Sequence, residues 1–188
     1  MKIQTLRTLS IILAAIVVVV SCKKDDDKKT SAFVGNYSIS EAKLTSDLVI
    51  PTNEAGDYTL ASGTDITAAI QQALLNAVTC GSASDSWVEL RADNSMYLSC
   101  MGANAVNAGT WLELSATSLQ LNMNATAIPP VGFSLTVSDV VIDASNLSGS
   151  TIIPMSTALI SALIAPMTLT EDAPPVFVMN ISIKFQKK

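Results

Sequence analysis

Alternating apolar and polar residues predict β-strands over most of residues 33–188. The clearest strand is the last, in which every second position is apolar: Phe177, Met179, Ile181, Ile183 and Phe185. Other strands are expected over residues 33–39, 48–50, 58–60, 87–92, 96–100, 110–114, 118–123, 131–137 and 151–153. About eight to ten short antiparallel strands with regularly spaced turns indicate a mainly β domain, either a barrel or a sandwich.

Breaks in the alternation predict where the strands turn or bend. Asp93 and Asn94 separate two strand-like runs and favour a hairpin turn. The apolar phase set by Val137 shifts to Val140 and Ile142, which predicts a bulge or a new strand near residues 138–139. A further turn is expected over residues 146–149.

Two segments have helical rather than strand periodicity. After residues 64–65, apolar residues recur with the spacing of one helix face, at Ile66, Ala69, Ile70, Ala73, Leu74, Ala77 and Val78. A second helix is expected over residues 156–165, with Leu159, Ile160, Leu163 and Ile164 on one side. Because Pro154 and Pro166 bound it, this segment is too short to span a membrane. We expect the second helix to pack on the sheet; the alternative is an apolar lid or partner surface.

The N-terminus carries a targeting signal. Lys2 and Arg7 precede an uncharged apolar run over residues 11–20, which is typical of a signal peptide and too short for a bilayer of about 30 Å. The order Val19-Val20-Ser21-Cys22 resembles the lipobox of bacterial lipoproteins. The resemblance implies that residues 1–21 are removed and that Cys22 is lipidated, which would attach the protein to a membrane. An ordinary secretory signal is the alternative.

A charged tether follows the lipobox. Residues 22–31 contain seven consecutive charged residues, at positions 23–29, and cannot bury apolar surface, so we expect a flexible spacer. The stretch also resembles the Lys- and Asp-rich export segment of Bacteroidetes lipoproteins. We therefore expect an outer-membrane lipoprotein, with the cell surface favoured over the periplasmic face, and a folded domain over residues 32–188.

Composition narrows the chemistry. The chain has 16 acidic against 11 basic residues and no histidine. Its acidic balance argues against nucleic acid, which requires a basic surface. Without histidine the common metal sites are weakened and Ser-His or Cys-His catalysis is excluded. The remaining acid–base candidates are the carboxylates of Asp139, Asp143, Glu171 and Asp172 in strands or loops and of Asp25 to Asp27 in the tether. Glu54 and Asp57, with Asp139 and Asp143, are possible calcium ligands. Their spacing matches no known catalytic or calcium-binding motif, so we expect no enzyme activity, cofactor or metal.

Two cysteines remain once Cys22 is assigned to the lipid. An oxidising compartment favours a disulfide between Cys80 and Cys100. The alternative is a pair of buried free thiols.

Four short motifs lie along residues 33–188. They are Phe-Val-Gly-Asn-Tyr at 33–37, the cysteine-flanked hairpin of residues 80–100, Gly-Thr-Trp-Leu-Glu-Leu at 109–114 and Ile-Lys-Phe at 183–185. Together they resemble the lipocalin-like lipoproteins of Bacteroidetes. The resemblance implies an antiparallel lipocalin-like β-barrel with two added helices. It also implies that Lys184 replaces the arginine that closes the base of lipocalins.

A barrel of this kind encloses a small apolar ligand when its inward side chains leave space. The candidate ligand-binding residues are Tyr37, Ile39, Trp111, Leu119, Leu121, Phe133, Leu135, Met179, Ile181 and Ile183, with Leu112 and Leu114 as alternatives to Trp111. The same residues would also make a filled core. The sequence therefore leaves two functions open: carriage of a small apolar molecule, or a protein–protein interaction module of a cell-surface complex that docks another envelope protein. An exposed apolar patch near residues 160–164 would favour the second.

Overall fold

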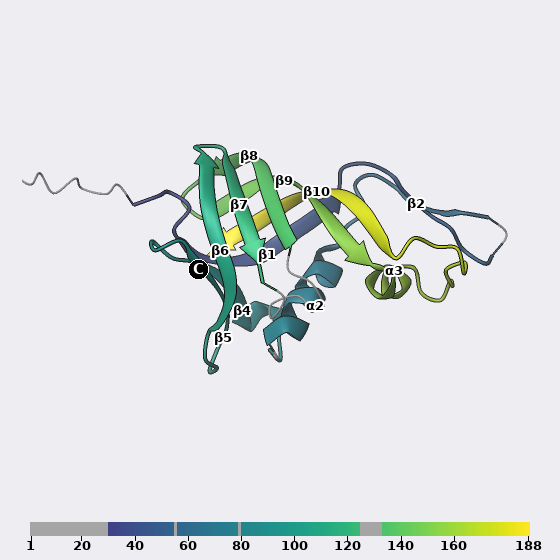
Figure 1. Ribbon diagram of the computed structural model, residues 1–188, viewed down its shortest axis with the longest axis horizontal. Helices are drawn as coiled ribbons and strands as arrows, with labels where there is room; N and C mark the ends of the chain where they lie inside the picture. Colours follow the sequence, from purple (N-terminus) through teal and green to yellow (C-terminus); the bar gives the residue numbers. More distant parts are fainter. Residues whose placement is uncertain (1–29, 55, 79, 125–132) are drawn as a thin grey trace, which may run out of the picture. The chain divides into compact units, whose positions relative to one another are not determined.

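Eight antiparallel strands close into a barrel in this computed structural model (Figure 1). Around the barrel the order is β1-β10-β9-β8-β7-β6-β5-β4, and β4 pairs with β1 to complete it. The barrel strands are β1 (Gly35–Leu44), β4 (Ser86–Leu90), β5 (Ser95–Cys100), β6 (Val106–Ser115), β7 (Ser118–Met123), β8 (Phe133–Ile142), β9 (Asn146–Ser156) and β10 (Val176–Lys187). The predicted mainly β fold is confirmed, and it is a barrel rather than a sandwich.

The structure describes residues 30–54, 56–78, 80–124 and 133–188, with the backbone alone at 73–78, 83 and 133. All helices and strands named here belong to the compact unit Ser31–Lys188. Cys22, the leader and most of the predicted tether lie outside the described residues.

Two predicted strands form a separate small sheet. β2 (Leu48–Ile50) pairs only with β3 (Tyr58–Leu60), outside the barrel order. Both have the alternation expected of a strand, and Ile50 and Leu60 are buried. Alternation reveals that one face is buried but not which strand lies alongside, so the sequence could not separate these strands from the barrel.

The expected turn at residues 146–149 is wrong. Those residues belong to β9, where Leu147 is buried and pairs with Phe185. The turn lies earlier, because the Asp143 carboxylate accepts hydrogen bonds from the backbone N–H groups of Ser145, at 2.8 Å, and Asn146, at 2.6 Å. An aspartate that caps the following backbone is a turn signal of its own, and here it decides the position.

The phase shift in β8 is a bulge within one strand. The register to β9 slips between Ser138 and Val141, and Asp139 has a positive φ of 54°. The extra residue keeps both Val137 and Val140 buried although they are three positions apart.

The closing seam between β1 and β4 is short. Only Gly35, Asn36 and Tyr37 pair with β4. Beyond them, the same edge of β1 is covered by residues that lead into helix α2 (Thr67–Val78). The N–H of Ile66 donates to the carbonyl of Ala42 at 2.9 Å, and the hydroxyl of Thr67 accepts from the Ala42 N–H at 2.8 Å.

A hydrogen bond near the start of helix α2 and a disulfide after its end connect the helix to the barrel. Near its start, the Gln71 side-chain amide donates to the Ile39 carbonyl at 2.8 Å, next to a register shift in β1. After its end, Cys80 forms a disulfide with Cys100 of β5, with Cα atoms 5.7 Å apart, so the predicted pairing is confirmed. The helix therefore bridges β1 and β5 beside the short seam.

Helix α3 (Thr157–Ile164) packs against the barrel. It contacts β9, β10 and α2, and Ile160 and Ile164 are buried. The expectation of a packed helix is thus confirmed, and the alternative of an exposed apolar surface at residues 160–164 is wrong. Among the described residues, no helix is both long and apolar enough to cross a bilayer.

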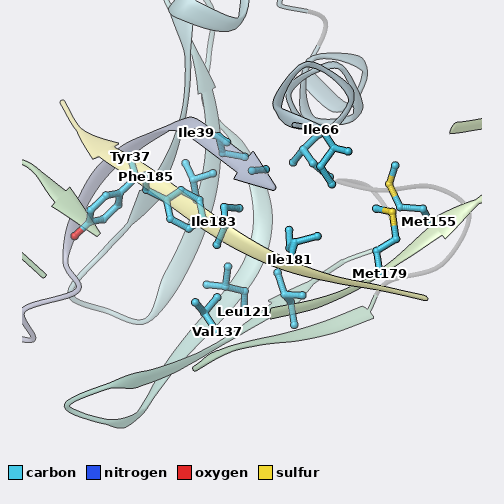
Figure 2. Packing of buried hydrophobic residues seen from close by; sticks show 14 of the residues in the cluster. Tyr37, Ile39, Ile66, Leu121, Val137, Met155, Met179, Ile181, Ile183 and Phe185 are labelled. Atoms are coloured by element: carbon cyan, nitrogen blue, oxygen red, sulfur yellow. The ribbon is translucent and has the colours of Figure 1, made fainter. Parts of the chain in front are cut away.

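The core follows the inward face of β10. Figure 2 shows Phe185, Ile183, Ile181 and Met179 in a row along this strand. Tyr37 packs edge-on to Phe185 at one end, with ring centroids 6.4 Å apart. At the other end Met155 of β9 and Ile66, before α2, complete the cluster (Figure 2). The alternation noted in the sequence therefore defines the main row of the core.

Replacing both disulfide cysteines, as Cys80→Ser with Cys100→Ser, should lower the free energy of unfolding by about 3 kcal/mol, because the disulfide closes a loop in the unfolded chain. Urea unfolding of the oxidised full chain measures this loss. Wild-type protein treated with reductant is the matched control and should resemble the double variant. An unchanged urea midpoint in the double variant would show that the disulfide does not stabilise the fold.

Candidate functional site

The structure brings nearly all of the candidate ligand-binding residues into the barrel interior. Of those whose side chains are described, every one is buried: Tyr37, Ile39, Trp111, Leu119, Leu121, Leu135, Met179, Ile181 and Ile183. The side chain of Phe133 lies outside the described part of the structure. The burial of these nine side chains agrees with the inward positions that the sequence predicted for them.

Trp111, and not its alternatives Leu112 and Leu114, points inward. Trp111 is buried, whereas Leu112 and Leu114 are about half exposed. The register between β5 and β6 shifts beside Ala108, so that Ala108 and Trp111 both face the interior. Gly109 is required here, because its φ is +135° and an added Cβ would lie 1.9 Å from the Asn122 carbonyl oxygen.

The polar atoms of the two inward aromatic residues are already bonded within the protein. The Trp111 indole N–H donates to the Arg91 carbonyl at 2.9 Å, and the Tyr37 hydroxyl donates to the Phe33 carbonyl at 3.0 Å. Burial raises the pKa of Tyr37, so its hydroxyl stays protonated and remains a donor. Neither aromatic residue has a hydrogen-bond donor left to orient a ligand.

Little space remains between these side chains. The cavity among Tyr37, Leu119 and Leu121 has a volume of about 20 Å³, which is room for roughly one water molecule. Val88, Leu90, Val137, Leu147 and Phe185 complete its apolar lining. Binding sites for small molecules usually measure about 300–1,000 Å³. At this level of the barrel the candidate residues form a packed core.

Lys184 does not close the barrel base as the resemblance implied. It alternates with the inward residues of β10 and is exposed on the outer face. The Trp111 ring instead meets Phe33 edge-on, with ring centroids 6.4 Å apart. Phe33 precedes β1 and is buried, so the residue on the Trp111 ring is aromatic and not basic.

The candidate carboxylates serve turns or lie at the surface. Backbone hydrogen bonding from Ser145 holds the pKa of Asp143 below its usual value, so this carboxylate stays ionised and keeps its turn. Asp139 occupies the β8 bulge, and the Glu54 carboxylate accepts a hydrogen bond from the Thr168 backbone at 3.2 Å. Within the described ranges, no group of three potential ligands is close enough to hold a metal ion.

A larger hollow lies on the outer face of β8, β9 and β10, and the sequence pattern did not predict it. Its volume is about 430 Å³. Seven hydroxyl- or amide-bearing residues line it: Thr45, Ser134, Thr136, Ser138, Ser150, Thr151 and Asn180. Thr151 is buried, and its hydroxyl donates to the Thr136 carbonyl at 2.8 Å. The signal was present in the polar half of each alternating strand, which is rich in Ser, Thr and Asn and poor in charge. Outward Ser, Thr and Asn residues are typical of solvated surface, so their pattern alone does not indicate a binding site.

Comparison with known proteins gives this chain no relatives. No family model, no curated protein and no solved structure matches it. Its function must therefore be argued from its own geometry.

Replacing Ile181 by alanine should lower the free energy of unfolding by about 2–5 kcal/mol, because a fully buried side chain would leave a cavity. The matched control is Ile152→Ala on the neighbouring strand; Ile152 is 58% exposed, so its loss should matter by less than about 0.5 kcal/mol. Urea unfolding without added ligand compares the two. Equal, small effects would show that the interior around Ile181 is open rather than packed.

Proposed function

We infer that this protein is a lipid-anchored, non-catalytic binding module of the cell envelope that recognises its partner through its outer surface. In this proposal the barrel is a rigid support, and the tether lifts it from the membrane. Like the second of the two functions that the sequence left open, the proposal needs no ligand inside the barrel, but it does not require the partner to be a protein.

The small interior cavity is the observation that carries the proposal. Of the residues expected to hold an apolar ligand, Tyr37, Leu119 and Leu121 line a cavity of only about 20 Å³, and the others whose side chains are described are buried in the core. The outer hollow is far larger, at about 430 Å³. A ligand that entered the barrel interior around Tyr37, Leu119 and Leu121 would have to displace core side chains. Protein interiors resist such displacement because they are close-packed.

A non-catalytic role is supported by the state of the ionisable groups. The chain has no histidine, and Asp93 and Asp143 accept hydrogen bonds within their own turns. Catalytic acids and bases need side chains that face a substrate with a suitable pKa. These two carboxylates instead have lowered pKa values, Asp93 chiefly through the Ser95 hydroxyl and Asp143 through the Ser145 backbone.

The proposed membrane location is argued from the N-terminal residues 1–29. The Val19-Val20-Ser21-Cys22 sequence supports lipidation at Cys22, and the charged residues after it support a flexible spacer. Many enterobacterial lipoproteins are retained in the inner membrane by an aspartate directly after the lipidated cysteine, and this chain has Lys23 there. We therefore propose the outer membrane, with the cell surface as the favoured face.

Carriage of a small apolar molecule is the second candidate. The lining of the small cavity is entirely apolar, as such a ligand would require. The packed core would then have to open, and the β1–β4 seam beside α2, where only three residue pairs join the strands, is the place we propose for it.

Changing Cys22 to serine should move the protein from the detergent phase to the aqueous phase in Triton X-114 partitioning, because the lipid is the proposed anchor. Cys80→Ser with Cys100→Ser is the matched control and should still partition with detergent. A Cys22→Ser chain that stays in the detergent phase would refute lipid anchoring. Protease added to intact cells tests the surface location separately and should degrade the domain.

Native mass spectrometry of the full lipidated chain, released in detergent, should show the covalent mass alone. Gentle collisional activation removes a non-covalently held molecule and leaves a lipid attached to Cys22. A reproducible non-covalent adduct of lipid-like mass would contradict outer-surface binding as the main function and would favour the carrier.

A further inference from the structure

The outer hollow is large enough for a small-molecule ligand and carries no charge. Its volume of about 430 Å³ lies within the usual range for such sites, about 300–1,000 Å³. None of its nine lining residues is charged. The floor is formed by β8, β9 and β10, and Thr45, which follows β1, lines it from a neighbouring segment.

Three hydroxyl groups in the hollow are free to bond with a ligand. Among the described residues, the side chains of Thr136, Ser138 and Ser150 have no hydrogen-bond partner in the protein, and all three are exposed. Ser138 lies directly opposite Ser150 in the β8–β9 register. Free donors and acceptors therefore come from two adjacent strands and converge on one space.

Two further polar groups at the rim are held in position. The Ser134 hydroxyl donates to the Asn122 side-chain oxygen at 2.7 Å, and the Asn180 amide nitrogen donates to the Ser46 hydroxyl at 3.2 Å. The Asn180 amide oxygen and the second amide hydrogen remain available after this bond. The rim is thus oriented by the protein before a ligand arrives.

Ile152 adds an apolar contact among these polar groups. It is 58% exposed, lines the hollow and lies opposite Asn180 in the β9–β10 register. A ligand that fits must therefore present hydrogen-bonding groups at its edge and an apolar surface at its face. A sugar ring does both, with hydroxyl groups around the ring and C–H groups on its faces.

Other ligand classes fit this chemistry less well. Phosphates and carboxylates are usually bound by Arg or Lys, and the lining has neither. An aliphatic chain would cover the free hydroxyls without replacing their bonds to water, which is unfavourable. We propose that the hollow on β8–β10 binds an uncharged oligosaccharide; this rests on the proposed outer-surface function and names its ligand class.

Isothermal titration calorimetry tests the proposal on the full chain in a detergent without a sugar headgroup. The probes are cellohexaose, maltohexaose and mannohexaose, with trigalacturonic acid as the charged comparison. At least one neutral probe should bind, and the acidic probe should bind at least tenfold more weakly. The Thr136→Ala/Ser150→Ala double variant should weaken binding of the neutral probe at least tenfold.

A matched control separates loss of the site from loss of the fold. Thr59→Ala removes an exposed hydroxyl from β3, outside the barrel, and should bind as the wild type does. Both variants change exposed residues, so their Tm should equal that of the wild type. Equal affinity of the double variant and the wild type would overturn the proposal, as would the absence of heat with all three neutral probes.

Cross-linking distinguishes failure of this inference from failure of the proposed function. A photo-reactive residue at position 150 in intact cells reports what covers the hollow. A protein cross-linked there, without sugar binding, overturns the oligosaccharide inference and leaves outer-surface binding in place. No sugar binding, no cross-link and a lipid-like adduct in the native mass spectrum would overturn both.

Discussion

The short seam between β1 and β4 is the constraint on which the rest of the structure depends. Buried backbone N–H and C=O groups must be paired, and only Gly35, Asn36 and Tyr37 find partners on β4. The remaining edge of β1 is satisfied by the segment that enters α2, through Ile66, Thr67 and Gln71. This requirement explains why a helix is inserted between two strands of a meander and why a disulfide fixes its far end to β5.

In our proposal the inner face of the barrel provides stability and the outer face provides recognition. Inside, the aromatic and aliphatic residues pack around a cavity of about 20 Å³, and the polar atoms of Tyr37 and Trp111 are bonded to backbone carbonyls. Outside, β8–β10 present uncharged hydroxyl and amide groups around a hollow of about 430 Å³. An interior packed in this way fixes the backbone of each strand, and a fixed backbone places the outer side chains in a constant array. A filled core is thus compatible with binding, provided that the ligand lies on the outer face.

The sequence predicted some elements of this arrangement and not others. The inward face of β10 could be predicted because Phe177 to Phe185 alternate without interruption. β6 could not, because a register shift near Ala108 changes which residues face inward, and no apolar pattern distinguishes Trp111 from Leu112 and Leu114. The turn before β9 was misplaced because Asn146–Gly149 contains turn-forming residues, whereas the hydrogen bonds of Asp143 fix the turn earlier. The outer hollow could not be predicted, because Ser and Thr on a single strand are typical of solvent-facing positions. They form one site only where three strands lie side by side.

By itself the sequence determined the type of most elements, the inward row of the core and the cysteine pair, because these follow from side-chain period and from the pairing expected of cysteines if the chain is exported. It also supplied the only argument for the proposed lipid anchor, since residues 19–22 resemble a lipobox. Tertiary structure decided which strands pair, that β2 and β3 lie outside the barrel, how much space the core leaves and which polar side chains share one hollow. These properties depend on distances between residues far apart in the chain, and a periodic pattern carries no information about such distances.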